Sequence, residues 1–463
     1  MRSSCAARDR NAARRVPPGL PASTRVALPS PPAWPVEPRP VTAYQPTAAW
    51  AAAADEADPL RAFRDEFLIP PHEGRDAHYF CGNSLGLQPR AVRGAVAAEL
   101  DYWGELAVEG HFKGRLPWMD YHEFVRDDLA LVVGAQPSEV VAMNTLGVNL
   151  HLMMVSFYRP TSNRHAILIE AGAFPTDRYA VESQIRYHGY DPATALIEVE
   201  GDEPNGTVSE AAFERALAEH GARTALVMLP GVQYRTGQAF DLKAIARLAH
   251  AQGCQVGFDL AHAVGNLPLQ LHDSDADFAI WCSYKYLNAG PGAVGGAFVH
   301  ERHARAALPR FAGWWGHDKA TRFQMGPQFM PTPGADGWQL SNPPILALAP
   351  LRVSLEVFRR AGMDRLREKS LRLTGYLEWL VHTQLADMLE IVTPAEPARR
   401  GAQLSIRVLG GRARGRALFE HLMAHGVIGD WREPDVIRIS PAPLYNRHAD
   451  CLAFAQEVRR FAA

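Results

Sequence analysis

Short apolar runs alternate with helical patterns along the middle of this 463-residue chain, and this alternation restricts its fold more than any other feature. The apolar runs have the length of strands and cover residues 165–170, 194–198, 224–230, 255–260, 276–282 and 294–299. Helical patterns at 177–187, 209–220 and 242–252 separate the first four runs. Such alternation is typical of a mostly parallel sheet with helices on both faces. The sequence therefore predicts an α/β fold.

The pattern changes after residues 341–344, which read Ser-Asn-Pro-Pro. A long helical stretch at 345–386 is interrupted only near Gly362, and shorter apolar runs and further helices follow it. We expect a large domain at 55–341 and a smaller α+β domain at 342–463.

Residues 1–54 are rich in proline and arginine and differ from the rest of the chain. Such a segment buries too little apolar surface to offset its chain entropy. We expect a disordered extension or a start codon placed too far upstream, and the composition also leaves an organellar transit peptide open. Helices at 55–70 and 91–106 are expected to enter the fold after it.

The charge balance and the cysteines exclude several classes of protein. The formal net charge is -2, so no electrostatic footprint for nucleic acid or an acidic membrane is visible. No apolar run approaches the roughly 20 residues that a spanning helix needs. The five cysteines are far apart and form no CxxC pair, which argues against a disulfide framework or a zinc site. We therefore expect a cytoplasmic protein without a metal ion, a nucleic-acid partner or a membrane partner.

Two charged residues lie at or just after the carboxyl ends of apolar runs. Asp259 stands in the run at 255–260, and Lys285 follows the run at 276–282. Ligands of open α/β sheets bind outside the carboxyl ends of the strands. A lysine that forms a Schiff base and an aspartate that keeps a pyridine nitrogen protonated are what pyridoxal 5′-phosphate (PLP) chemistry requires. Each residue alone is more simply a helix cap or a surface charge, and their pairing leaves both interpretations open.

Longer strings decide between these interpretations. They are 80–87 (FCGNSLGL), 143–151 (MNTLGVNLH), 174–177 (FPTD), 257–265 (GFDLAHAVG), 283–288 (SYKYLN), 311–317 (FAGWWGH) and 341–344 (SNPP). From about His78 to the C-terminus the chain resembles the kynureninase family, PLP enzymes of fold type I in the aminotransferase class V-like superfamily. The YKYLN and GWWGH strings are the most specific. The resemblance implies a large domain with a mostly parallel seven-stranded sheet and a smaller C-terminal α+β domain.

The resemblance also implies an activity. It is the PLP-dependent hydrolysis of the Cβ–Cγ bond of L-kynurenine or 3-hydroxy-L-kynurenine, which gives anthranilate or 3-hydroxyanthranilate and L-alanine. Tryptophan degradation and NAD precursor synthesis both use this step. The family resemblance further implies a small-molecule amino-acid substrate and a homodimer with a composite active site.

The family's roles can be transferred residue by residue. The catalytic residues would be Lys285, Tyr284 and Asp259, with Tyr284 as a candidate proton donor. The cofactor contacts would be Leu146, Gly147, Phe174, Pro175, Thr176, Asp177, Asp259, His262, Tyr284, Lys285, Trp314 and Asn342. The substrate contacts would be Arg438, His111, Asn342 and Ser84. Trp314 and Asn342 would reach across the dimer interface, and Arg438 would grip the substrate carboxylate with its two-pronged guanidinium.

Two positions depart from the family pattern. Gly147 stands where members usually carry a hydroxyl residue, and Pro230 stands where some carry a serine. Both departures affect the expected phosphate contacts and neither affects the lysine chemistry. His111 and Asn342 resemble the pair found in members that act well on 3-hydroxykynurenine, although His111 alone would pass for a surface histidine.

Two other functions are compatible with the same fold. A cysteine desulfurase-like enzyme needs a nucleophilic cysteine on a mobile loop. Cys282 lies in an apolar run and Cys451 opens a helical pattern, and the residue before Lys285 is tyrosine rather than the histidine of that branch. A non-catalytic relative without PLP is expected to have lost Lys285 or Asp259, and this chain has both.

Overall fold

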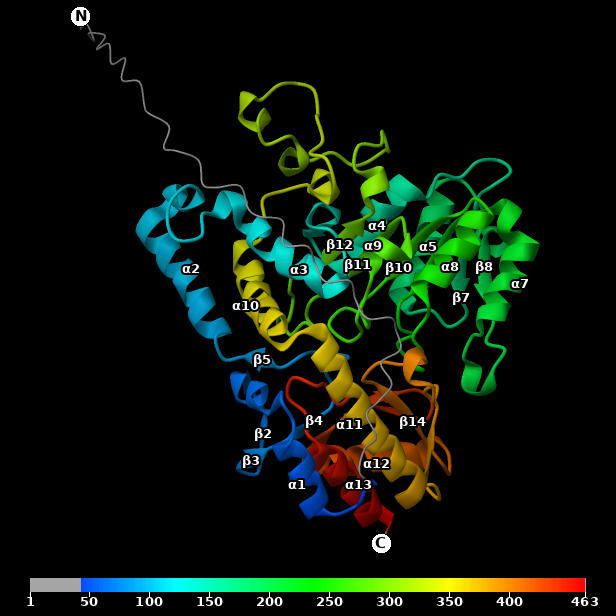
Figure 1. The fold of residues 1–463 in the computed structure, drawn as a ribbon. Helices are drawn as coiled ribbons and strands as arrows, with labels where there is room; N and C mark the ends of the chain where they lie inside the picture. The colour runs from blue at the N-terminus through cyan, green and yellow to red at the C-terminus, as the bar shows by residue number, and fades with distance from the viewer. Residues whose placement is uncertain (1–42, 463) are drawn as a thin grey trace, which may run out of the picture. The chain divides into compact units, whose positions relative to one another are not determined.

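The central sheet has seven strands, and six of them run in the same direction. A computed structural model describes residues 43–462 and gives the strand order β6-β12-β11-β10-β9-β7-β8 (Figure 1). The exception is β12, which runs in the opposite direction to the other six and is antiparallel to both of its neighbours, β6 and β11. The strands are β6 (Val140–Ala142), β7 (Ala166–Glu170), β8 (Leu196–Val199), β9 (Thr224–Pro230), β10 (Gln255–Asp259), β11 (Phe278–Trp281) and β12 (Gly296–Val299). The expected α/β fold with a mostly parallel seven-stranded sheet is confirmed.

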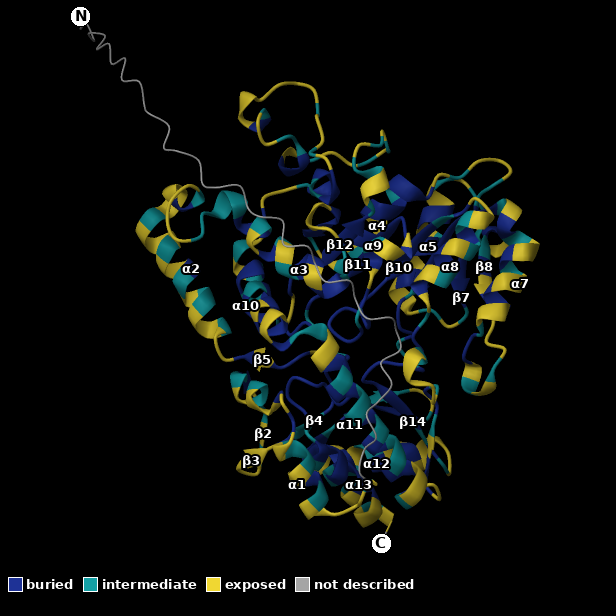
Figure 2. Cartoon of the chain, in the orientation of Figure 1, coloured by how far each residue is buried: buried dark blue, intermediate teal, exposed yellow. Residues whose placement is uncertain are grey.

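The sheet is covered by helices on both faces, as its uninterrupted apolar runs require. In β9, Val227 and Leu229 pack with one set of helices, while Leu226 and Met228 pack with the other set. This alternation follows from the two-residue period of a strand. The first set contains α3 (Arg126–Val133), α7 (Glu210–His220), α8 (Leu242–Ala251) and α10 (Ile345–Ala361). The second contains α4 (Leu146–Phe157) and α5 (Pro175–Tyr187), and the strands between the two sets are almost wholly buried (Figure 2).

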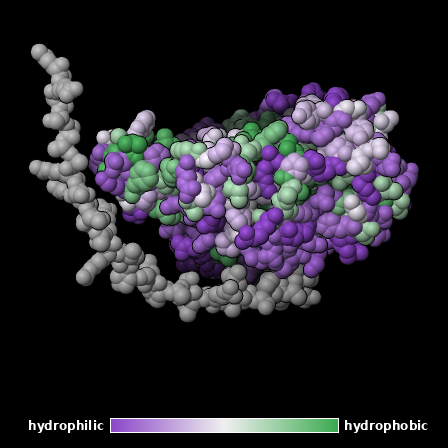
Figure 3. Space-filling model, turned by 90° about the horizontal axis from the view of Figure 1, so that it is seen from above, coloured by the Kyte–Doolittle hydropathy of each residue, from purple (hydrophilic) through white to green (hydrophobic). Residues whose placement is uncertain are grey.

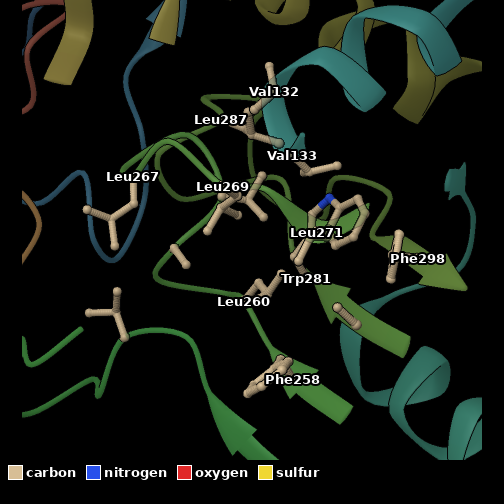
Figure 4. Close-up of a cluster of buried hydrophobic side chains, with 14 of the residues drawn as sticks. Val132, Val133, Phe258, Leu260, Leu267, Leu269, Leu271, Trp281, Leu287 and Phe298 are labelled. Atoms are coloured by element: carbon tan, nitrogen blue, oxygen red, sulfur yellow. The ribbon is translucent and has the colours of Figure 1, made fainter. Parts of the chain in front are cut away.

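Trp281, the last residue of β11, is fully buried among the apolar side chains that pack with the first set of helices. The side chains around it include Val132, Val133, Leu269 and Leu271 (Figure 4). Gly296 is its partner on β12, where a Cβ atom would lie 2.2 Å from the indole ring. This packing fixes the end of β11, from which the chain continues directly to Lys285.

A second sheet has four antiparallel strands in the order β13-β14-β17-β16. They are β13 (Leu389–Ile391), β14 (Leu404–Val408), β16 (Asp430–Arg432) and β17 (Val436–Ile439). The helices α11 (Met363–Gln384), α12 (Arg412–Ala424) and α13 (His448–Ala462) share a separate buried cluster with this sheet. The described residues belong to one compact unit, so the domain boundary at 341/342 stays a prediction.

The N-terminal segment is joined to this second part of the fold. Helix α1 (Ala48–Glu56) packs on α13, and β4 (His78–Tyr79) pairs in parallel with β15 (Val427–Ile428). The backbone N–H of Phe80 donates to the Ile428 carbonyl at 2.9 Å. Two further short pairs are β1 (Phe67–Leu68) with β5 (Gln88–Pro89), and β2 (Pro71–His72) with β3 (Arg75–Asp76).

Most expected helices are present, but the first is misplaced. The helix expected at 55–70 is instead α1, which ends at Glu56, and a 3-10 helix at Arg61–Glu66. Pro59 disfavours a helical backbone at Asp58, which accounts for the break. Residues 48–54, which the sequence assigned to the extension, lie in α1, while residues 1–42 lie outside the described part of the chain.

The remaining helical expectations hold closely. The helix expected at 91–106 is α2 (Val92–Leu106), and the stretch at 345–386 forms α10 and α11. Gly362 separates them with a φ of 78°, a left-handed backbone that favours glycine. Short helices α6 (Pro192–Ala195) and α9 (Leu271–Ser274) complete the set. Within residues 43–462, no helix combines the length and the apolar character needed to cross a membrane.

A buried ion pair joins the N-terminal segment to α11. Nζ of Lys369 lies 2.7 Å from Oδ2 of Asp58, and both side chains are almost completely buried. Burial lowers the pKa of Lys369, and the Asp58 carboxylate opposes this shift. Arg372 lies farther away, at 4.0 Å from the other carboxylate oxygen.

We predict that Lys369→Met lowers the free energy of unfolding by about 3 kcal/mol, because it leaves the buried Asp58 carboxylate with the Leu60 N–H as a donor but only the distant Arg372 as a cation. Urea unfolding of both proteins measures the difference. The control is Arg412→Met, which breaks a pair with Glu433 in which both side chains are more than half exposed. The control should change stability far less, and equal losses in the two variants would contradict the prediction.

Candidate active site

A cavity of about 430 Å³ lies where β7, β9 and β10 end. Glu170, Pro230 and Asp259 are the last residues of these strands, and all three line the cavity. The cavity therefore occupies the carboxyl edge of the sheet, where α/β folds bind ligands. The sequence-predicted residues that line it are Ser84, Leu146, Gly147, Phe174, Thr176, Asp177, Asp259, His262, Tyr284, Lys285 and Arg438.

Lys285 reaches the cavity from the loop that follows β11. Its Nζ lies 3.0 Å from Nε2 of His262 and 5.9 Å from the ring centroid of Phe174. Burial, and then the charge of Lys285, hold the pKa of His262 well below its usual range. The imidazole is therefore neutral, and its Nε2 accepts a hydrogen bond from the ammonium group. This bond orients the amine within the cavity.

Gly86 contacts the loop that carries Lys285, here called the lysine loop. Its backbone N–H donates to the Tyr284 carbonyl at 2.8 Å. A Cβ atom at Gly86 would lie 2.3 Å from the Lys285 carbonyl oxygen and 2.2 Å from Oδ1 of Asn288. Only glycine allows this close approach of two backbones. The segment at 80–87 thus contacts the lysine loop directly.

Three buried carboxyl groups line the cavity. Burial raises the pKa of Asp259, although the backbone N–H of Ala261 donates to Oδ1 at 2.7 Å and opposes the shift. Burial, followed by the charge of Asp259, raises the pKa of Asp177 well above its usual range. Burial also raises the pKa of Glu170 to about 8. Negative charge is therefore costly here, and a cationic ligand group beside Asp259 would stabilise its ionised form.

The N-termini of two helices also line the cavity. Leu146 and Gly147 open α4, while Thr176 and Asp177 belong to the first turn of α5. A Cβ atom at Gly147 would contact only Cγ2 of Thr176, at 3.9 Å. The first-turn amides of a helix are free donors and carry a partial positive charge, which suits a phosphate group. The position also has room for the hydroxyl side chain that the family usually carries.

Two arginines enter the cavity from the second sheet. Arg438 on β17 is buried, donates to the Tyr234 carbonyl at 2.8 Å, and forms an ion pair with Asp430. Arg432 on β16 lies 3.1 Å from the same Asp430 carboxylate. Two guanidinium groups share one carboxylate, so this wall retains a net positive charge that suits an anionic substrate group.

Tyr284 keeps its proton in this environment. Burial raises the pKa of its hydroxyl above the usual value, and the neighbouring Cys282 adds to the shift. The side chain lines the cavity next to Lys285, whose Nζ lies 6.0 Å from the tyrosine ring centroid. Its O–H is therefore available as a donor at neutral pH.

The chemistry of the cavity matches the groups of PLP. Oδ1 of Asp177 and Nδ1 of His262 are buried without a hydrogen-bond partner, which costs free energy unless a ligand satisfies them. The helix N-termini suit the phosphate, Asp259 suits the protonated pyridine nitrogen, and the Lys285 amine suits the aldehyde. The residues present therefore fit this cofactor.

Comparison with known proteins identifies the family. The chain is 70% identical to the kynureninase of Xanthomonas euvesicatoria pv. vesicatoria (strain 85-10) over 415 residues, which cover 90% of this chain and 98% of that protein. The chain belongs to the kynureninase family. The kynureninase of Stenotrophomonas maltophilia (strain K279a) is 69% identical, with coverage of 89% and 97%. The model of the kynureninase C-terminal domain matches residues 366–458.

Solved structures at low sequence identity share the fold. The cysteine desulfurase CsdA from Escherichia coli has a TM-score of 0.70 at 16% identity, covering 87% of this chain and 98% of that chain. The cysteine desulfurase of Thermococcus onnurineus NA1 has a TM-score of 0.67 at 16% identity, covering 88% and 96%. This likeness shows the fold alone. In the described part of the chain the four cysteines, Cys81, Cys254, Cys282 and Cys451, are buried, and none offers the exposed thiol that the desulfurase alternative needs.

Four predicted residues of the kynureninase site do not line this cavity. Pro175 is the first residue of α5, where it has no N–H to donate. The indole of Trp314 donates to the Arg322 carbonyl at 3.2 Å, and His111 packs edge-on against Trp118. Asn342 is exposed on the chain before α10. The roles predicted for His111, Trp314 and Asn342 stay predictions, as does the dimer interface across which Trp314 and Asn342 would act.

The cavity also contains residues that the sequence did not single out. They are Asn83, Thr145, Glu170, Val232, Tyr234, Ala261 and Arg432. Glu170 ends β7 as Asp259 ends β10, so the strand-end rule that found Asp259 applies equally to it. Tyr234 and Arg432 carry no comparable local signal, because the packing of the second sheet against the loop after β9 brings them together.

We predict that Gly86→Ala reduces kcat by on the order of 100-fold, because the added methyl group displaces the lysine loop. Steady-state turnover of L-kynurenine measures the loss. Gly94→Ala in α2 is the matched control, since a Cβ atom there meets nothing within 4 Å. Wild-type kcat in the Gly86→Ala protein would show that the loop tolerates the displacement.

Proposed function

We propose that this protein hydrolyses the Cβ–Cγ bond of L-kynurenine, and of its 3-hydroxy form, with PLP as cofactor. The products are anthranilate or 3-hydroxyanthranilate, and L-alanine. The observation that carries the proposal is the convergence of Lys285, Asp259 and Arg438 on one cavity in a chain of the kynureninase family. The reaction belongs to tryptophan degradation and to the synthesis of NAD precursors.

Lys285 is the residue proposed to move the proton at Cα. Bound PLP supplies an electron sink for the charge that develops there. The neutral His262, 3.0 Å from Nζ, holds the amine in position without adding a competing positive charge. Asp259 is proposed to stabilise positive charge on the pyridine nitrogen, because a buried carboxylate needs a cationic partner.

Tyr284 is the proposed proton donor to the γ-carbonyl oxygen as water adds to that carbon. Its raised pKa keeps the hydroxyl protonated, and its side chain lines the same cavity as Lys285. After addition, the Cβ–Cγ bond breaks, the aromatic acid leaves, and Cβ takes up a proton in the part of the substrate that becomes L-alanine. General acids contribute typically 100- to 10,000-fold to such steps, so removal of this hydroxyl is expected to slow cleavage.

Arg438 is proposed to bind the substrate α-carboxylate. The contacts with Tyr234 and Asp430 fix the plane of its guanidinium, and its buried Nε has no hydrogen-bond partner. Arg432 supplies a second positive charge on the same wall. A fixed planar fork binds a carboxylate with two parallel hydrogen bonds, which a lysine cannot do.

We also propose a cytoplasmic homodimer with composite active sites. Exposed apolar side chains support the dimer, since such patches mark interaction surfaces. They include Trp103, Val108, Phe112, Phe311, Trp314, Phe323, Met325 and Met330, and hydrophobic surface is visible in several places in Figure 3. Few, widely spaced cysteines are compatible with a reducing compartment.

The lysine assignment predicts that Lys285→Ala abolishes turnover of both kynurenines and removes the visible absorption of the lysine-bound cofactor. Its circular dichroism should match that of the wild type. The control is Lys243→Ala, an exposed residue on α8 that should leave both readouts unchanged. Turnover at the wild-type rate in Lys285→Ala would refute the proposed function.

The arginine assignment predicts that Arg438→Lys raises KM for L-kynurenine at least about tenfold, with a smaller change in kcat. The reason is that a lysine ammonium group cannot form the two parallel hydrogen bonds that a guanidinium forms with a carboxylate. Arg407→Lys on β14 is the control, as this residue pairs with Glu390 away from the cavity. An unchanged KM in Arg438→Lys would mean that another group holds the carboxylate.

A further inference from the structure

Two histidines and a glutamate meet on the far side of the second sheet. His421 lies in the last turn of α12, His425 is the residue that follows the end of this helix, and Glu457 lies on the neighbouring α13. One ligand atom from each of the three residues lies within 4.8 Å of the others. Histidines four residues apart share one face of a helix, which is the spacing that helical zinc sites use.

The polar atoms of His421 and Glu457 face each other without a hydrogen bond. Nε2 of His421 lies 3.6 Å from Oε2 of Glu457, and both atoms are buried without a partner. The other carboxylate oxygen, Oε1, accepts from Arg460 at 2.7 Å, so the carboxylate orientation is fixed. Two buried polar atoms without hydrogen-bond partners cost free energy, and a cation between them would remove this cost.

His425 offers a third lone pair. Its Nδ1 lies 2.8 Å from the backbone carbonyl oxygen of His421. A carbonyl oxygen only accepts, so Nδ1 is the donor here and Nε2 is the ring nitrogen that a metal ion would bind. Histidines that bind metals commonly donate their second ring nitrogen to a carbonyl in this way. The two imidazole centroids lie 4.1 Å apart, so both rings face the same region.

A second cluster of two histidines and a glutamate has no carboxylate oxygen without a hydrogen-bond partner. Glu139, His272 and His300 also lie within ligand distance of one another. The Glu139 carboxylate, however, already accepts from the backbone N–H groups of Gln136 and Glu301, both at 2.8 Å, and contacts His272 at 3.0 Å. Its lone pairs are engaged in a structural network, so this cluster serves as an internal comparison.

We propose that His421, His425 and Glu457 bind a divalent transition-metal ion of the zinc class. Two imidazoles and a carboxylate are the ligands that Zn²⁺ accepts, at about 2.0–2.2 Å each. Tetrahedral ligands at that radius lie about 3.3 Å apart, close to the 3.6 Å between Nε2 of His421 and Oε2 of Glu457. His425 is exposed, so its ring has room for the small adjustment that brings Nε2 to the ion while Nδ1 keeps its contact with the His421 carbonyl.

A cavity gives the ion access to the site. It has a volume of about 430 Å³, and its lining includes His425, Glu457, His72 and Arg460. Three protein ligands leave the fourth position of a tetrahedral ion to water in this cavity. The bound ion would join α12 to α13 and so stabilise the second buried cluster, to which both helices contribute.

Calorimetric titration of the tag-free, PLP-loaded protein with Zn²⁺ alone tests this proposal. PLP in the active site keeps Asp259 and His262 from acting as competing ligands. We expect one ion per chain, and an increase of several degrees in Tm on addition of Zn²⁺, because binding to the folded state alone stabilises it. Glu457→Gln and His425→Ala should each weaken binding at least about tenfold and remove the Tm shift.

Two controls make the result specific. His382→Ala replaces an exposed histidine near the end of α11, and His272→Ala disrupts the comparison cluster. Both should bind Zn²⁺ as the wild type does, and kynurenine turnover should be unchanged in Glu457→Gln and His425→Ala. No binding by the wild type, wild-type affinity in Glu457→Gln, or loss of binding in His272→Ala would each overturn the proposal.

Discussion

The carboxylate of Asp259 lies at the end of a strand that is buried on both faces, where water cannot stabilise its charge. A buried carboxylate without a cation costs several kcal/mol, so the surrounding groups must compensate. Lys285 provides one positive charge, and the neutral state of His262 avoids a second one beside it. In the proposed site, the protonated ring nitrogen of the cofactor would complete this balance. Much of the arrangement at the sheet edge follows from the need to stabilise the charge of the buried Asp259 carboxylate.

The site requires both sheets. The large sheet supplies the lysine, the aspartate and the helix N-termini, whereas Arg438 and Arg432 come from the antiparallel sheet. The carbonyl of Tyr234, on the loop after β9, accepts from Arg438 and connects the two parts at the cavity wall. Chemistry at the lysine and recognition of the substrate carboxylate are thus assigned to different parts of the chain, and their relative position depends on this contact.

The sheet could be predicted well from the sequence because the signals for its strands lie within short segments of the chain. Strand-length apolar runs, Pro and Gly positions and the strand-end residue Asp259 need no knowledge of distant contacts. The helix break before Pro59 is also a local signal, because proline disfavours a helical backbone at the residue before it. The cavity positions of Tyr234 and Arg432 are different, because they depend on contacts between segments about 200 residues apart in sequence.

The pairing of β4 with β15 has a consequence for biosynthesis. The N–H of Phe80 donates to the carbonyl of Ile428, 348 positions later (428 − 80). At about 5–20 residues per second, the ribosome needs roughly 20–70 seconds to deliver that acceptor. During this interval the central sheet can form, because its strands end at Val299, but β4 has no strand to pair with. The nascent chain therefore assembles the lysine end of its active site well before the carboxylate-binding end, and depends on the last part of the polypeptide to complete it.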